Sequence, residues 1–331
     1  MERLRLTLAC GRYDRTLPLA EGRARPEGID LNVVFLGYEE LFWRMLRHEE
    51  FDASEMSLSS YMMARHRGRP EFVAIPVFPA RVFRHSSIYV NARAGIRGPK
   101  DLLGRRVGVP EYQMTAAVWV RGILEHEYGV PTRDLLWFNG GLDQPNREEK
   151  LPLNLPSHIR LQPIGPGRTL TEMLVGGELD ALVTARPPSA YLKGDPTVRR
   201  LFADYKAEEV AYFKKTGIFP PMHTVVIRRP VYEANRWVAQ SLYKAFCVAK
   251  EDCSLDRLFD GQLRFALPHL HAAVEESKQL FGDVDMWPYG VEANRRTLET
   301  LVQYSVEQGL TPAAVPVDEL FAPETLDAFR N

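Results

Sequence analysis

The alternation of apolar and polar positions predicts strands followed by helices in the first part of the chain. Residues 3–10 alternate charged and apolar side chains before Gly11, which is typical of a strand ending in a loop. The same pattern predicts further strands at 30–36 and 51–58, and helices at 38–48 and 61–67. Strands that alternate with helices indicate a largely parallel sheet covered by helices.

A second unit of the same kind follows a segment with a different pattern. In residues 75–91 two apolar extended stretches flank the polar residues 84–87, and we interpret this segment as a crossover between two lobes. Strands are then predicted at 106–109, 135–138 and 180–184, with helices at 114–128 and 170–174. Residues 139–156 are rich in Gly, Pro, Asn and charge, so we expect a long loop or hairpin of poor order there.

The last third of the chain predicts a return to the first unit. Residues 222–228 are extended, 230–250 form one long amphipathic pattern, and the chain is helical from 268 onward, including 294–308. We expect lobe one to comprise 1–88 and 225–331, and lobe two 89–224. The predicted fold class is therefore α/β, with two hinge-linked lobes and a helical C-terminal return.

Composition narrows the possible partners and the compartment. The 331 residues include 42 basic and 43 acidic ones, so a formal charge of -1 gives no overall field for nucleic acid or an anionic membrane. The chain has no apolar run of about twenty residues, and charge interrupts residues 1–10 too often for a signal peptide. Cys10, Cys247 and Cys253 form no metal-spaced pair and no disulfide framework. We expect a cytoplasmic protein.

Ligands of open α/β sheets bind beyond the carboxyl ends of the strands. Residues that follow four predicted strands are therefore candidates for binding a small molecule: Arg12, Tyr13, Asp14, Arg15, Ser57, Ser59, Glu111, Tyr112, Thr115 and Arg186. Arg12 and Arg15 offer two guanidinium groups to a dicarboxylate, although incidental ion pairs with Asp14 are the alternative. Ser59 and Thr115 stand at helix starts, where they either cradle a carboxylate or simply cap the helix.

Two histidines and one glutamate are candidates for proton transfer. Arg84, His85 and Ser86 lie between apolar segments, so their side chains need either partners or a cleft. His85 has a side chain that titrates near neutrality, although a lone histidine is more often structural. His223 begins the return segment, which we expect near the hinge. Glu55 alternates with Ser57, so it either points to the cleft floor or pairs with an arginine.

Other features leave alternatives open. Trp287 and Tyr289 either stack on an aromatic ligand or anchor the C-terminal helices. No H-E-x-x-H, C-x-x-C, Walker A or G-x-G-x-x-G motif occurs, so we expect no required organic cofactor. A divalent metal on Glu55, His85 and His223 is not distinguished by sequence from a histidine–carboxylate relay. The apolar C-terminal helices are compatible with a homo-oligomer.

Five segments together resemble one enzyme family. They are GRYDRT at 11–16, RHSSIYVN at 84–91, GVPEYQMTA at 108–116, MHTVVI at 222–227 and WPYGVEAN at 287–294. In this order they resemble the 4,5-dihydroxyphthalate decarboxylase family over nearly the whole chain. The resemblance implies a type II periplasmic-binding-protein-like fold that serves aromatic-acid degradation, converting 4,5-dihydroxyphthalate to protocatechuate and carbon dioxide.

The resemblance also gives the proton-transfer candidates a task. One histidine or Glu55 would remove a phenolic proton, and another group, His85, His223 or a tyrosine, would protonate the ring carbon. The first alternative is a non-catalytic solute-binding or sensing protein that uses the same fold. The second is another enzyme on this scaffold, either a decarboxylase of a different hydroxylated aromatic acid or a protein like the pyrimidine-precursor synthases.

Overall fold

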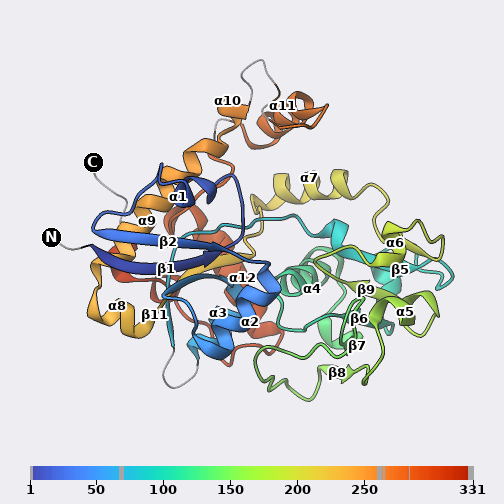
Figure 1. The fold of residues 1–331 in the computed structure, drawn as a ribbon. Helices are drawn as coiled ribbons and strands as arrows, with labels where there is room; N and C mark the ends of the chain where they lie inside the picture. Colours follow the sequence, from blue (N-terminus) through green and yellow to red (C-terminus); the bar gives the residue numbers. More distant parts are fainter. Residues whose placement is uncertain (1–2, 67–70, 259–262, 264, 283, 327–331) are drawn as a thin grey trace.

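The computed structural model describes residues 3–66, 71–258, 263, 265–282 and 284–326. Two mixed β-sheets lie side by side, each covered by helices (Figure 1). We call the five-stranded sheet with its helices the first lobe and the six-stranded sheet with its helices the second lobe. The predicted two-lobed α/β fold class is confirmed.

The first lobe is built on a sheet with the strand order β2-β1-β3-β11-β4. Its strands are β1 (Leu4–Cys10), β2 (Ile29–Phe35), β3 (Ala53–Ser57), β4 (Phe72–Ile75) and β11 (His223–Arg228). β1 is parallel to β2 and β3, whereas β11 is antiparallel to β3 and β4 because it belongs to the returning chain. In this register His223 pairs with Ser57 and Val225 pairs with Glu55, so all four side chains share one face.

The second lobe has the strand order β10-β5-β9-β6-β7-β8. Its strands are β5 (Ile88–Asn91), β6 (Arg106–Val109), β7 (Leu136–Asn139), β8 (Arg160–Pro163), β9 (Ala181–Val183) and β10 (Val198–Arg200). β9, β6, β7 and β8 run parallel, and β5 is antiparallel to both of its neighbours. Both sheets are therefore mixed, and the strands that adjoin the crossovers account for the departure from the expected parallel pattern.

Helices cover both sheets. They are α1 (Leu17–Ala20), α2 (Tyr38–His48), α3 (Leu58–Arg65), α4 (Thr115–Tyr128), α5 (Leu170–Val175), α6 (Ser189–Leu192), α7 (Tyr205–Thr216), α8 (Arg229–Ala234), α9 (Trp237–Lys250), α10 (Leu255–Leu258), α11 (Leu270–Phe281) and α12 (Arg295–Glu307). The prediction of one helix at 230–250 is wrong. Asn235 leaves helical geometry with φ -147° and ψ 66°, which ends α8 two residues before α9 begins.

The two segments that connect the lobes lie against each other. Met222 donates its backbone N–H to Ala80 at 2.8 Å, and Val82 donates to Pro220 at 3.1 Å. The buried guanidinium of Arg81 strengthens this junction by donating to the carbonyl of Phe219 at 2.9 Å. These bonds fix the position at which the chain passes between the lobes.

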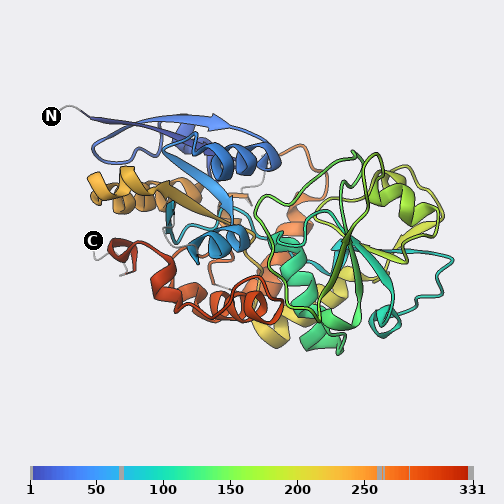
Figure 2. The same ribbon diagram turned by 90° about the horizontal axis from the view of Figure 1, so that it is seen from below.

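The C-terminal helices join the two lobes along one side (Figure 2). α12 packs on α4 of the second lobe, where a Cβ atom at Gly122 would lie 2.0 Å from the ring of Tyr304, so only glycine permits this approach. Phe321 then pairs with Ala74, which returns the chain to the first sheet. Within the described residues, no helix has the length and apolar character needed to cross a membrane.

Candidate functional site

A cavity of about 990 Å³ lies between the lobes at the carboxyl ends of β1, β3, β6 and β9. The predicted site residues that line it come from both lobes: Tyr13, Arg15, Ser57, Arg84, Glu111, Thr115, Arg186 and His223. The strand-end rule therefore finds several walls of one space, because each of these four strands delivers its following loop or helix there.

The first functional group of the cavity is a hydrogen-bonded chain of three side chains. His223 Nδ1 lies 2.6 Å from Glu55 Oε1, and the Tyr13 hydroxyl donates to the same oxygen at 2.9 Å. The Gly11 N–H donates to Glu55 Oε2 at 2.7 Å. Burial opposes ionisation of Glu55, but the hydrogen bond and charge of His223 and the other two donors outweigh it and lower its pKa. Burial and the Glu55 charge raise the pKa of Tyr13.

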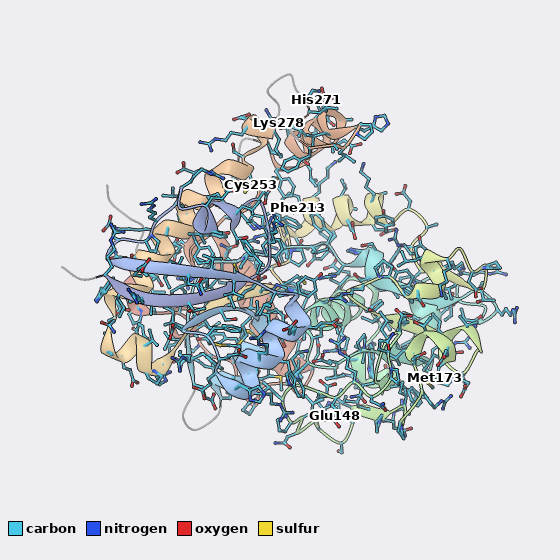
Figure 3. All side chains as sticks on the ribbon, in the orientation of Figure 1. Glu148, Met173, Phe213, Cys253, His271 and Lys278 are labelled. Carbon is cyan, nitrogen blue, oxygen red and sulfur yellow. The ribbon has the colours of Figure 1, made fainter. Side chains whose placement is uncertain are left out.

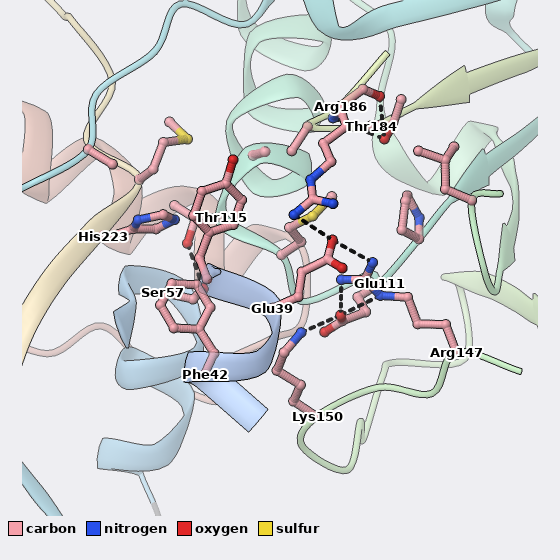
Figure 4. Close-up of a pocket in the computed structure, with 18 of the residues that line it drawn as sticks. Glu39, Phe42, Ser57, Glu111, Thr115, Arg147, Lys150, Thr184, Arg186 and His223 are labelled. Atoms are coloured by element: carbon pink, nitrogen blue, oxygen red, sulfur yellow. Dashed lines mark hydrogen bonds and ion pairs between the residues drawn. The ribbon is translucent and has the colours of Figure 1, made fainter. Parts of the chain in front are cut away.

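His223 is held with its second nitrogen available. The ring packs edge-on against Phe42 at a centroid distance of 4.8 Å and tilted against Tyr38 at 5.7 Å. Figure 4 shows the ring at the wall of the cavity. No hydrogen-bond partner of Nε2 is found in the described part of the chain. With Nδ1 oriented by Glu55, Nε2 can exchange a proton with a molecule in the cavity.

Arg84 supplies an unpaired positive charge to the same cavity. Its side chain is only 6% exposed, and its polar contacts are Met222 Sδ at 3.1 Å and Ser87 Oγ at 3.4 Å. None of the described carboxylates forms an ion pair with it. Burial lowers the pKa of Arg84 to about 10. A buried cation without an anion is costly, so this side chain suits a carboxylate of a bound molecule.

The starts of α3 and α4 meet at the cavity floor. Ser57 caps α3 by accepting the Ser60 N–H at 3.4 Å, and its Oγ lies 2.9 Å from Thr115 Oγ1. Thr115 Oγ1 also accepts the Ser59 N–H at 3.0 Å, so that amide is already satisfied. The N–H groups of Thr115 and Ala116 have no acceptor among the described residues. The start of α4, not that of α3, therefore offers free amides to an anion.

A charged cluster forms the opposite side of the cavity (Figure 4). Glu111 Oε1 accepts hydrogen bonds from Lys150 Nζ and, at 2.7 Å, from Arg147 Nε. Arg147 also reaches across to Glu39 on α2 of the first lobe at 2.9 Å. Arg186 lies 3.7 Å from the same Glu39 oxygen. These ion pairs connect the second lobe to the first over the mouth of the cavity.

His85 does not line this cavity. It is 1% exposed and sits in the second lobe against the rings of Tyr128, Phe202 and Tyr212 at centroid distances of 6.0, 5.4 and 5.4 Å. Neither of its ring nitrogens has a hydrogen-bond partner among the described residues. Burial lowers the pKa of His85 to about 4. The expected pairing of His85 with His223 at one site is therefore absent from the structure.

The predicted residues around Arg15 form a packed corner. Arg15 stacks between the rings of Tyr13 and Trp287, with centroid distances of 4.3 and 4.1 Å, and it donates to Asp14 Oδ1 at 2.9 Å. Trp287 donates its indole N–H to the Phe78 carbonyl at 2.9 Å, so it anchors the C-terminal segment. Arg15 reaches the cavity, whereas Asp14 and Trp287 support it from behind.

Six other predicted residues lie outside the cavity lining, namely Glu55 and Ser59, whose contacts are given above, and Arg12, Ser86, Tyr112 and Tyr289. Arg12 is exposed, while Tyr289 is buried beneath Lys250 at 5.2 Å. Ser86 uses its N–H to bond Glu209 at 3.0 Å, and Tyr112 donates its hydroxyl to the Gln308 carbonyl at 3.1 Å. Residues that are adjacent in sequence to cavity-lining residues can thus point away from the cavity.

Sequence reasoning missed several cavity residues. Arg147 and Lys150 belong to the 139–156 loop, whose composition suggested poor order, yet Lys150 is buried and the loop packs over the cavity. This loop follows the carboxyl end of β7, so the strand-end rule could have found it. Tyr38, Glu39 and Phe42 were assigned only to an amphipathic helix. Among the described residues no group of three or more His, Cys, Asp or Glu side chains is arranged to hold a metal ion.

Comparison with known proteins shows a similarity in sequence to two curated proteins and, separately, a similarity in fold to solved structures. No family model matches the chain. It is 38% identical over 331 residues to 4,5-dihydroxyphthalate decarboxylase of Comamonas testosteroni, covering 100% of both chains. It is also 42% identical over 204 residues to 4,5-dihydroxyphthalate decarboxylase of Pseudomonas putida, covering 62% of this chain and 79% of that one.

Solved structures share the fold at low sequence identity. The periplasmic aliphatic sulphonate binding protein SsuA from Escherichia coli has a TM-score of 0.54 at 15% identity, covering 98% of this chain and 99% of that one. The desulfurization enzyme DSZB has a TM-score of 0.51 at 16% identity, covering 98% of each chain. The fold is thus periplasmic-binding-protein-like, as predicted. Because the identity to the Comamonas testosteroni protein extends over the full length of both chains, this chain belongs to the 4,5-dihydroxyphthalate decarboxylase family.

Proposed function

We propose that this chain is a carboxy-lyase that removes one carboxylate from 4,5-dihydroxyphthalate, giving protocatechuate and carbon dioxide. The observation that carries the proposal is the placement of His223, oriented by buried Glu55, in the same cavity as the unpaired Arg84. Loss of carbon dioxide from an arene needs a proton at the carbon that loses it, and a fixed imidazole can deliver one.

The carboxylates of the substrate belong at the end of the cavity near Arg84 and His223. Arg84 contacts the side chain of Met222, the residue before His223, and all three line the cavity. Arg84 and the free amides of Thr115 and Ala116 bind the carboxylate that stays. The leaving carboxylate loses water among Phe42, Tyr38 and Met222, which favours its departure as neutral carbon dioxide.

A non-catalytic binding protein would use the Arg84 cation but would not need the relay formed by Glu55 and His223. A solute receptor needs Arg84 and the helix amides, whereas a fully buried carboxylate aligned on His223 adds nothing to the binding of an anion. The shared fold does not favour the receptor function, because one scaffold hosts many activities. The relay and the name of the full-length relative both support catalysis.

The direct test is incubation of the purified protein with 4,5-dihydroxyphthalate while carbon dioxide release is followed. Parallel reactions contain phthalate, 4-hydroxyphthalate or a chelator, which tests the need for hydroxyl groups and for a divalent ion. Release of carbon dioxide and protocatechuate in equal amounts is the expected result. Tight binding of 4,5-dihydroxyphthalate without any turnover would instead identify a receptor.

We further propose that the chain acts in the cytoplasm and as a homo-oligomer. Its three cysteines are free thiols, which suits a reducing compartment. Leu263, Phe265, Leu267 and Val284, around α11, are all at least half exposed, and such apolar side chains favour burial against a second copy. Sedimentation equilibrium would measure the oligomeric state, and a purely monomeric protein would refute that part.

A further inference from the structure

The side of the cavity opposite His223 holds a carboxylate that no binding role above explains. Glu111 follows β6 and is only 2% exposed, and its Oε1 accepts bonds from Lys150 and Arg147. Its other oxygen, Oε2, has no hydrogen-bond partner among the residues described. We propose that Glu111 is a catalytic base, which accepts the proton of the substrate hydroxyl para to the leaving carboxylate. This inference rests on the proposed decarboxylation.

The arrangement of the cavity matches the arrangement of the substrate. Figure 4 shows His223 on one side and Glu111 with its two cations on the other. Para positions of a benzene ring point in opposite directions, so a ring carbon facing His223 presents its para hydroxyl to Glu111. In 4,5-dihydroxyphthalate both carboxylates lie at one end of the ring and both hydroxyls at the other. The Arg84 end therefore takes the carboxylates and the Glu111 end the hydroxyls.

The reaction balances with these two residues. Glu111 takes the phenolic proton, and ring electrons move toward the carbon that bears the leaving carboxylate, which receives a proton from His223. The bond from that carbon to the carboxylate then breaks, and its electron pair restores the aromatic ring as carbon dioxide leaves. The phenolate recovers its proton from Glu111, and His223 is reprotonated by solvent. One proton is consumed for each carbon dioxide, with no net oxidation.

Lys150 and Arg147 can stabilise the negative charge that forms on the substrate hydroxyl oxygen when it loses its proton. Lys150 is buried, and both cations line the cavity beside Glu111. When Glu111 holds the proton, negative charge has moved to the substrate oxygen, and two adjacent cations stabilise it there. The cations pair with Glu111 before the proton moves and with the substrate oxygen afterwards. The charge of the cluster is therefore balanced both before the proton moves and in the phenolate state.

The test compares Glu111→Gln with Glu178→Gln. Glu178 stands just before β9, is exposed, pairs with exposed Arg168 and does not line the cavity. Its backbone N–H donates to Met173, which Figure 3 labels within the second lobe. Glu111→Gln should lower kcat at least about 100-fold. It should leave the affinity for phthalate, which has no hydroxyl, within about threefold of wild type, whereas Glu178→Gln should leave both values within about twofold. Thermal unfolding checks that each variant is folded.

A more acidic substrate separates a base from a structural residue. Ring fluorination adjacent to the hydroxyl lowers the pKa of that hydroxyl. Deprotonation of such an analogue therefore depends less on a catalytic base. The loss of kcat in Glu111→Gln should therefore shrink about tenfold or more with the fluorinated substrate. An equal loss with both substrates, or a kcat near wild type, overturns the role of Glu111. If wild-type protein releases no carbon dioxide from 4,5-dihydroxyphthalate, the proposed function itself fails.

Discussion

His223 Nδ1 lies 2.6 Å from Glu55 Oε1, on neighbouring antiparallel strands that carry the two side chains on the same face. β3 is an outgoing strand of the first lobe, and β11 is the first strand after the chain returns from the second lobe. The pair therefore forms only when the crossover brings two segments 168 positions apart together. Because Glu55 is fully buried, the imidazole is held by an inflexible partner.

Glu55→Gln should lower kcat by about 100-fold while the KM changes little. The amide keeps the size of the side chain but no longer stabilises an imidazolium at His223, so less of the enzyme carries the proton that His223 must deliver to the ring carbon. Steady-state carbon dioxide release measures both constants. Glu50→Gln, which removes an exposed carboxylate paired with Arg44, is the matched control and should behave like wild type. A kcat for Glu55→Gln within threefold of wild type would show that the relay has no catalytic role.

The same carboxylate should make the stability of the protein depend on acidity. The pKa of Glu55 is lower in the folded state than in the unfolded state, so its carboxylate stabilises the fold above the ordinary glutamate pKa. That stabilisation is lost as the pH falls through the lowered folded-state pKa. Urea unfolding at pH 3 to 7 should show a smaller acid-induced loss for Glu55→Gln than for wild type. Parallel curves would mean that the pair contributes no acid-dependent stability.

Arg84→Met should weaken substrate binding and stabilise the fold. A charge-assisted bond to a carboxylate contributes about 1.5–3 kcal/mol, so its removal should raise the Kd for phthalate about 10- to 100-fold. Burial lowers the pKa of Arg84 from its ordinary value to about 10, so keeping the charge in the folded protein costs stability at neutral pH. Methionine removes this cost, and the free energy of unfolding should rise by roughly 1–3 kcal/mol.

Calorimetric binding and urea unfolding separate the two effects in this variant. A variant that binds phthalate as wild type does would remove Arg84 from the site. A loss of both binding and stability would show that the guanidinium has a structural partner in the folded protein.

Periodicity alone predicts much of the architecture. α2 and β6 have the predicted bounds, because each combines a clear apolar pattern with a glycine or proline next to it. β8 and β10 were missed, since each is a short strand with a half-exposed face and no strong apolar alternation. The division of 230–250 at Asn235 depends on a single residue with low helix propensity, which a periodic pattern does not register.

The candidate site was predictable in part, for a physical reason. Strand ends converge in space, so Tyr13, Ser57, Glu111 and Arg186 could be grouped without coordinates. The direction in which each side chain of a loop points could not be read from the sequence. Arg12 is exposed, whereas its neighbour Tyr13 faces Glu55. The ion pairs between lobes depend on packing distances that sequence spacing does not contain.

Glu39→Gln should weaken substrate binding by about two- to fivefold and make it less sensitive to salt. Glu39 on α2 pairs with Arg147 at 2.9 Å and Arg186 at 3.7 Å across the cavity mouth. These pairs are partly exposed, so each contributes at most about 1 kcal/mol to holding the lobes together. Titrations of phthalate at low and high ionic strength measure the effect, which should disappear near 1 M salt.

Glu40→Gln is the matched control for this change. Glu40 is the next residue of the same helix turn, but it pairs with Arg44 at 2.8 Å within its own lobe. It should leave the affinity for phthalate unchanged at every salt concentration. If both variants weaken binding alike, general charge near the mouth matters and the pairs between the lobes do not.

His85→Phe should stabilise the protein in acid and leave decarboxylation within about threefold of wild type. The pKa of His85 is about 4 in the folded state and 6.5 as the ordinary value. Between these values the unfolded chain binds a proton that the folded protein does not, so the free energy of unfolding falls as the pH falls from about 7 to 4. The full loss is roughly 3 kcal/mol, and phenylalanine among Tyr128, Phe202 and Tyr212 removes it. Urea unfolding at several pH values measures this, with His85→Leu as a smaller replacement in case the larger ring does not fit. A folded variant that loses 100-fold in kcat would instead restore His85 to the catalytic role that its sequence motif suggested.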